Sequence, residues 1–208
     1  MKGKTHITIG PSTFLLLLPP SPSNLIVLSG YTILGSLVPD IDTEYGLIHS
    51  SESILLIITI FIYTFIAIPF KTLSFIGTIL FIFLLNRSAS FNHRTFTHSI
   101  IGIIVFSLPI LLMSPRLLVP FNLGYCMHLF ADSFTKSGVP LFLPYNKKKY
   151  GPKLIKSSGE CDSIIYFLTF FLTLFIIFKT YTNEDLLISI QNFFLPILNL
   201  IFKKLVLI

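Results

Sequence analysis

Eight apolar runs, separated by short polar stretches, make up more than half of this chain. They cover residues 7–18, 24–38, 54–70, 72–85, 100–113, 117–131, 163–178 and 186–202. Only 12% of the 208 residues are charged, about half of the roughly 25% that a soluble domain carries. So few charges cannot cover the surface of a folded domain, and we therefore expect lipid to surround much of the chain.

The pattern within the runs favours helices over strands. Strict alternation of apolar and polar residues is absent, which argues against a β-barrel. Several runs have only 12–16 residues, fewer than the roughly 20 that a helix needs to cross a bilayer. We predict an all-α, polytopic membrane helix bundle of about eight short apolar segments, some spanning only part way. It forms one domain over 1–208, with a core at 3–162 and a C-terminal hairpin at 163–208. The basic N-terminus lacks a cleavage site, and we expect it to be retained.

The basic residues are distributed unequally if every run crosses the membrane and Lys2 lies inside. The outer side then receives only Lys71, Arg116 and Lys179. The inner side receives Lys2, Lys4, Arg87, Arg94, Lys136, Lys147, Lys148, Lys149, Lys153, Lys156, Lys203 and Lys204. Because Lys and Arg concentrate in cytoplasmic loops, the inner side is predicted to be cytoplasmic. This explains the net charge of +6 without nucleic acid, for which no binding motif is present.

Histidines and acids cluster in the stretches that this topology places inside. His128 and Asp132 are four residues apart at the end of an apolar run, so on a helix they share a face. Ionisable groups at such a position are costly and usually functional. A neutral imidazole beside a carboxylate fits two ligands of one ion, or a ligand and its supporting partner.

Two other segments carry similar residues. Asp40 and Asp42 follow Pro39, which disfavours a continuing helix. In an extended chain both carboxylates face one side, although two acids could equally end an apolar segment. His93 and His98 diverge by roughly 140° on a regular helix, so their convergence requires a loop or a helix start between them.

Together these residues suggest a divalent-metal site. The candidate ligands are His6, Asp40, Asp42, His93, His98, His128 and Asp132. Mixed imidazole and carboxylate ligands suit Zn²⁺, Mn²⁺ or Fe²⁺ better than Mg²⁺ or Ca²⁺, and Zn²⁺ is our first choice. Seven ligands exceed the four of a tetrahedral ion, so one or two ions could bind.

Basic residues near these ligands could bind an anionic group. Arg94 suits a phosphate or a ligand carboxylate. Lys147, Lys148 and Lys149 could hold an anionic substrate group or simply lie at the membrane surface.

The order of these motifs resembles a known family. Thr5-His6, Gly35-x-x-x-Pro39-Asp40-Ile41-Asp42, His93-Arg94-x-x-Thr97-His98-Ser99 and His128-x-x-x-Asp132-Ser133 occur in sequence. This arrangement is similar to that of the YdjM-like membrane-bound, metal-dependent hydrolases, over residues 3 to 162. The resemblance implies a bacterial inner-membrane protein with these His and Asp residues as ligands. It also implies an acidic residue after the basic loop, and either Glu160 or Asp162 could fill that position.

Three functions fit these features. In a hydrolase, a metal would activate water and one of the acids, Asp42 or Asp132, would act as general base. Arg94 would assist catalysis by contacting a phosphate or a ligand carboxylate. The substrate would be a membrane-associated phosphoester or lipid. A divalent-metal transporter is the second reading, although transporter sites lie near the bilayer midplane. The third is a membrane scaffold that keeps a metal for stability.

Overall fold

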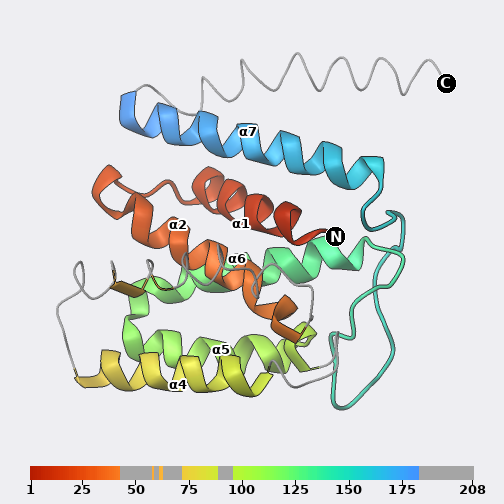
Figure 1. The fold of residues 1–208 in the computed structure, drawn as a ribbon, viewed down its shortest axis with the longest axis horizontal. Coiled ribbons are helices and arrows are strands. Elements are labelled where there is room, and N and C mark those ends of the chain that lie inside the picture. The colour runs from red at the N-terminus through yellow and green to blue at the C-terminus, as the bar shows by residue number, and fades with distance from the viewer. Residues whose placement is uncertain (43–57, 59–60, 63–71, 89–95, 183–208) are drawn as a thin grey trace.

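The fold is a bundle of α-helices that lie side by side along a common direction, as a computed structural model shows (Figure 1). The structure describes residues 1–42, 58, 61–62, 72–88 and 96–182. Its α-helices in these ranges are α1 Gly3–Leu17, α2 Pro22–Leu37, α4 Thr72–Ser88, α5 Ile100–Met113, α6 Pro115–Ser133 and α7 Glu160–Thr182. Two short 3₁₀ helices complete them, η1 Val38–Asp42 and η3 Phe96–His98. The predicted all-α class is confirmed.

The helix ends lie where the local sequence places them. Pro22 and Pro115 stand at the first positions of α2 and α6, where the missing N–H costs nothing. The Ser99 hydroxyl accepts a hydrogen bond from the Gly102 N–H and so caps α5, which fixes His98 directly before this helix.

Helix α6 is the centre of the bundle, because it contacts α1, α2 and α5. It packs most closely on α2, where backbone meets backbone. A Cβ on Gly35 would lie 2.0 Å from the Phe121 carbonyl oxygen, and one on Gly124 would lie 2.0 Å from that of Thr32. Only glycine permits this approach, which is typical of helix pairs in membranes.

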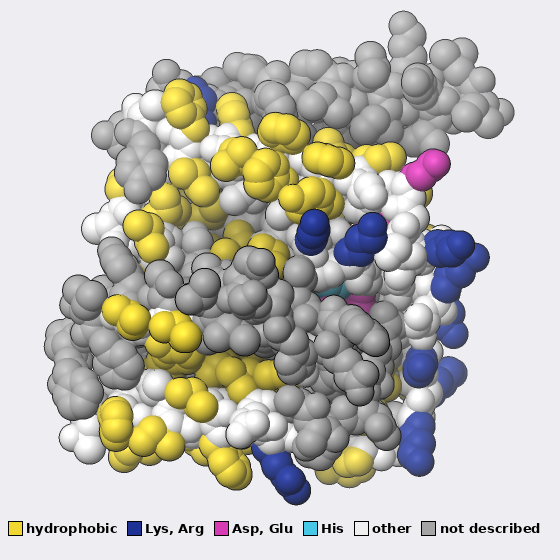
Figure 2. All heavy atoms as spheres, viewed as in Figure 1, with side chains coloured by type: hydrophobic (Ala, Val, Ile, Leu, Met, Phe, Trp, Pro, Cys, Tyr) yellow, Lys and Arg dark blue, Asp and Glu magenta, His cyan; other side chains and the backbone are white. Residues whose placement is uncertain are grey.

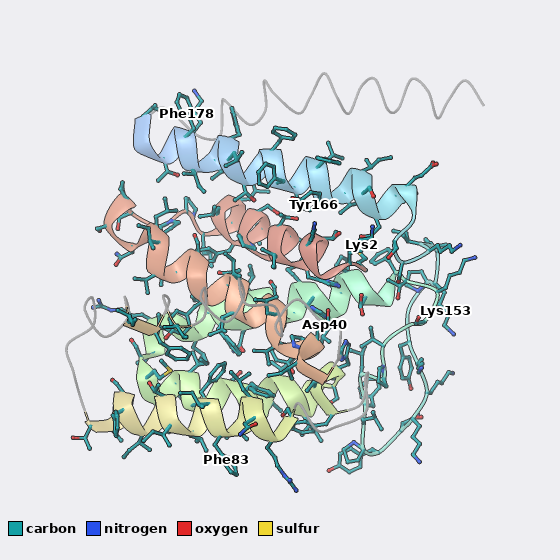
Figure 3. The ribbon with its side chains drawn as sticks, in the orientation of Figure 1. Lys2, Asp40, Phe83, Lys153, Tyr166 and Phe178 are labelled. Carbon is teal, nitrogen blue, oxygen red and sulfur yellow. The ribbon has the colours of Figure 1, made fainter. Side chains whose placement is uncertain are left out.

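Helices α4 and α7 form the outer layers. α4 packs on α5, and α7 packs on α1. Phe83 on α4 and Phe178 on α7 point away from the bundle (Figure 3), with exposed fractions of 61% and 62%. Lipid is the solvent that such apolar outer faces fit.

The number of membrane spans is where the structure departs from the prediction. Six of the eight predicted runs correspond to described helices, and runs 54–70 and 186–202 lie mostly or wholly outside the described residues. Among the described helices, only two are long and apolar enough to cross a membrane, Pro22–Ile41 and Glu160–Thr180. About eight spans are therefore not established, because helices such as α5, with 14 residues, are short.

Candidate metal centre

Four separated elements bring His and Asp side chains together at one end of the bundle. α1 provides His6, η1 provides Asp40, η3 provides His98, and α6 provides His128 and Asp132. Figure 3 shows Asp40 beyond the end of α2, among the neighbouring helix ends. His6, His98, His128 and Asp132 are fully buried, whereas the Asp40 side chain is 18% exposed. The cluster is thus inside the protein, with one carboxylate near its surface.

The side chains lie within reach of a shared cation. The Nε2 atoms of His98 and His128 are each 3.6 Å from Asp40 Oδ1, and His98 Nε2 is 3.8 Å from Asp132 Oδ2. On the other side, His6 Nε2 is 3.1 Å from Asp132 Oδ1, which the Met1 amino group also contacts. Two groups have all their ligand atoms within 4.8 Å of one another: His6 with Asp40 and His128, and His98 with His128 and Asp132.

The imidazole rings are packed against one another, but the packing leaves some of their ring nitrogens without hydrogen-bond partners. The His6 and His128 rings stack with their centroids 3.8 Å apart, and the His98 ring meets His128 edge-on at 5.3 Å. Nδ1 of His6 and Nε2 of His128 have no hydrogen-bond partner. Buried polar atoms are nearly always hydrogen-bonded. Nitrogen atoms that converge on carboxylates without such bonds fit a divalent cation, because its bonds would satisfy them.

A backbone carbonyl fixes the tautomer of His128. Its Nδ1 lies 2.7 Å from the Ser36 carbonyl oxygen, which can only accept, so Nδ1 must carry the proton. In the neutral ring, the lone pair is then on Nε2, which faces Asp40. Orientation of a ligand imidazole by a carbonyl on its other nitrogen is usual in metal sites.

His98 is held by its neighbours in a similar way. Its Nδ1 lies 3.3 Å from the Thr97 hydroxyl. The Tyr125 hydroxyl donates to the Thr97 carbonyl oxygen at 2.5 Å, and Tyr125 is three residues before His128 on α6. The same helix therefore carries two ligands and also positions the segment that carries a third.

The sequence profile of the YdjM inner membrane protein family matches residues 1–198. The chain belongs to this family. The resemblance seen in the motifs is thereby confirmed, and with it an inner-membrane location. No curated protein and no solved structure matches the chain.

The fold of this YdjM family member brings together five of the seven predicted ligands. His93 and Arg94 lie outside the described residues, as does the side chain of Asp42, whose backbone ends η1. Lys147, Lys148 and Lys149 are exposed on the loop after α6.

Sequence reasoning missed Ser36, which orients His128, and left the choice between Glu160 and Asp162 open. Ser36 acts through a backbone carbonyl, which no sequence pattern reveals. Asp162 is fully buried, whereas Glu160 is exposed. The structure thus distinguishes two acids that the sequence left equivalent. The sequence signal that pointed to these acids was that Glu160 and Asp162 both stand in the first turn of an apolar helix.

Proposed function

We propose that this protein is a membrane-bound, metal-dependent hydrolase that acts on a membrane-associated phosphoester or lipid. The observation that carries the proposal is the meeting of three imidazoles and two carboxylates, from four elements, in a buried cluster with unsatisfied ring nitrogens. Assembly of so many polar groups in an apolar chain is costly without a function.

The metal would be held by His6, Asp40, His98, His128 and Asp132. This donor set suits Zn²⁺ first, and Mn²⁺ or Fe²⁺ next. Two overlapping groups share His128, so one or two ions could be accommodated. When bound, the ion supplies Lewis-acid activation of water and of a phosphoryl or acyl oxygen.

The two described carboxylates have different environments and therefore different proposed roles. Asp132 is buried against His6 and the Met1 amino group, so it holds the cluster together. Asp40 is partly exposed and is the carboxylate that can meet both a substrate and the ligands. Asp42, two residues further on, is the second candidate for the general base. Arg94 is the candidate for binding a phosphoryl group of the substrate.

The basic loop between α6 and α7 supports an anionic substrate. Its exposed lysines are Lys136, Lys147, Lys148, Lys149, Lys153 and Lys156. Figure 2 shows Lys and Arg side chains gathered along one edge of the molecule, and in Figure 3 Lys153 lies there, at the same end of the bundle as Asp40. A lipid headgroup or other phosphate could be bound there by Lys147, Lys148 and Lys149.

The same charges support a multi-pass topology with the site on the cytoplasmic side. Replacement of Lys153 or Arg116 by cysteine in a variant lacking Cys126 and Cys161 tests this. In intact cells, an impermeant maleimide should label Arg116→Cys and not Lys153→Cys.

Elemental analysis of the purified protein is the first test of the hydrolase. Stoichiometric Zn, Mn or Fe is expected, with metal-dependent hydrolysis of a chromogenic phosphodiester or of inner-membrane phospholipids. His128→Ala and Asp132→Ala should lose both metal and turnover, while Glu160→Gln, a change at an exposed acid, should retain both. Wild-type protein without transition metal would refute the proposal, and metal flux into proteoliposomes without turnover would favour a transporter.

A further inference from the structure

The buried carboxylate of Asp162 joins two helices that are distant in the sequence. Asp162 is the third residue of α7 and is fully buried. Its Oδ1 accepts a hydrogen bond from the Thr5 hydroxyl at 2.7 Å. Its Oδ2 accepts from the Lys2 N–H at 3.0 Å and from the Ser158 N–H at 2.9 Å. Both oxygens are therefore used, and Asp162 belongs to neither group of candidate ligands.

The start of α1 needs such a partner. Its N-cap residue, Lys2, makes no side-chain hydrogen bond, and its first turn contains no acidic residue. The first N–H groups of a helix lack partners within it, and a negative charge there is favourable because of the helix dipole. Asp162 supplies from α7 both the acceptor and the charge that the local sequence does not provide.

His6 follows Thr5 directly in this anchored turn. We propose that Asp162 is a positioning residue, which holds the first turn of α1 so that the His6 ring stacks on His128 beside Asp132. The proposal rests on the proposed function, because it assigns His6 to the metal centre. A loosened first turn would move His6 while leaving the ligands on α6 and η3 in place.

Metal affinity measures the effect of the hydrogen bonds by which Asp162 holds the first turn of α1. Asp162→Asn retains the size of the side chain and one carbonyl acceptor but removes the charge and one acceptor oxygen. We expect metal affinity, measured by chelator competition, to fall by about 10–100-fold, the usual cost of losing a group that supports a ligand. The matched control is Glu160→Gln, in the same turn of α7 but exposed, and its affinity should be unchanged.

A double-mutant cycle separates positioning from general stability. If Asp162 acts through His6, Asp162→Asn should cost little additional affinity in a His6→Ala background, because coupled residues are not additive. Equal losses in both backgrounds would overturn the proposal, since they would show that Asp162 stabilises the protein without setting His6.

A measurement without metal keeps this test independent of the hydrolase. The chain has only five histidines, so ¹³C-labelled histidine gives few ring signals, and His6→Ala assigns that of His6. In metal-free protein, Asp162→Asn should remove the ring-current shift that stacking on His128 causes, while Glu160→Gln should not. An unchanged His6 signal would overturn the proposal. If the wild-type protein binds no metal but Asp162→Asn still removes this shift, only the hydrolase proposal is refuted.

Discussion

Helix α2 with its continuation to Ile41, and helix α7, are the two described stretches long and apolar enough to cross a membrane, yet they have different places in the molecule. In the most apolar 18-residue window of each stretch, 67% of the residues are buried in Pro22–Ile41 but only 11% in Glu160–Thr180. Helix α2 lies against α6, and α7 contacts α1 at the edge of the bundle (Figure 1). Apolar composition alone therefore does not distinguish a helix inside the bundle from one at the surface of its described part.

The difference lies in the small and polar residues. Helix α2 contacts α6 through Gly35, Thr32 and Ser36, the last of which also provides the carbonyl that orients His128. In α7, residues Phe167, Phe171 and Phe178 face outward with exposed fractions of 57–62%. Close backbone approach fixes the ligand geometry on the inner helices, whereas the outward face of α7 makes no such contact with the described bundle and needs only apolar side chains.

Gly124→Ala should have the largest effect on stability. The added methyl group would lie 2.0 Å from the Thr32 carbonyl oxygen, so α2 and α6 would have to separate. We expect a loss of about 3 kcal/mol or more, because overpacking against backbone cannot relax easily. Unfolding in mixed micelles measures this. Gly159→Ala is the control, since its nearest contact would be 3.1 Å away, and an equally large loss there would contradict the close-packing explanation.

Tyr125→Phe should have a smaller effect that appears at the metal site. It removes the hydroxyl that donates to the Thr97 carbonyl oxygen and leaves a buried acceptor, at a cost of about 1–3 kcal/mol. Because η3 carries His98, metal affinity should also fall, by roughly tenfold. Chelator competition measures the affinity, and a stability loss with unchanged affinity would show that Tyr125 does not position His98.

Local patterns in the sequence predicted much of the inner bundle. The run 100–113 coincides with α5, and the four-residue spacing of His128 and Asp132 places both in one cluster because α6 is a regular helix there. The run 7–18 begins four residues after α1 does, because Thr5 and His6 are polar yet buried by partners elsewhere in the chain. Apolar periodicity cannot reveal such partners, since Thr5 and Asp162 are 157 residues apart.

Thr169→Val tests whether α7 has any specific attachment to the inner bundle beyond its first turn. The Thr169 and Thr8 hydroxyls are 2.7 Å apart between α7 and α1. Valine keeps the shape but removes the hydrogen bond, which is worth about 0.6 kcal/mol on average between membrane helices. Unfolding in micelles should detect a loss of this size, and Thr173→Val, whose hydroxyl bonds the Thr169 carbonyl within α7, is the matched comparison. Equal losses would mean that the contact between helices contributes nothing of its own.

Phe171→Leu should have the smallest effect. The Phe171 side chain is 59% exposed on α7. Phenylalanine and leucine side chains both fit a lipid environment, and the substitution leaves no cavity there. The free energy of unfolding should therefore change by less than about 0.5 kcal/mol. The same substitution at Phe121 on α6, which is fully buried and packs edge-on against Phe81 and Tyr125, should cost about 1 kcal/mol or more, because it removes ring contacts inside the core. If Phe171→Leu proved as costly as Phe121→Leu, the outer face of α7 would have to be covered by protein rather than lipid, and the contrast between α2 and α7 would fail.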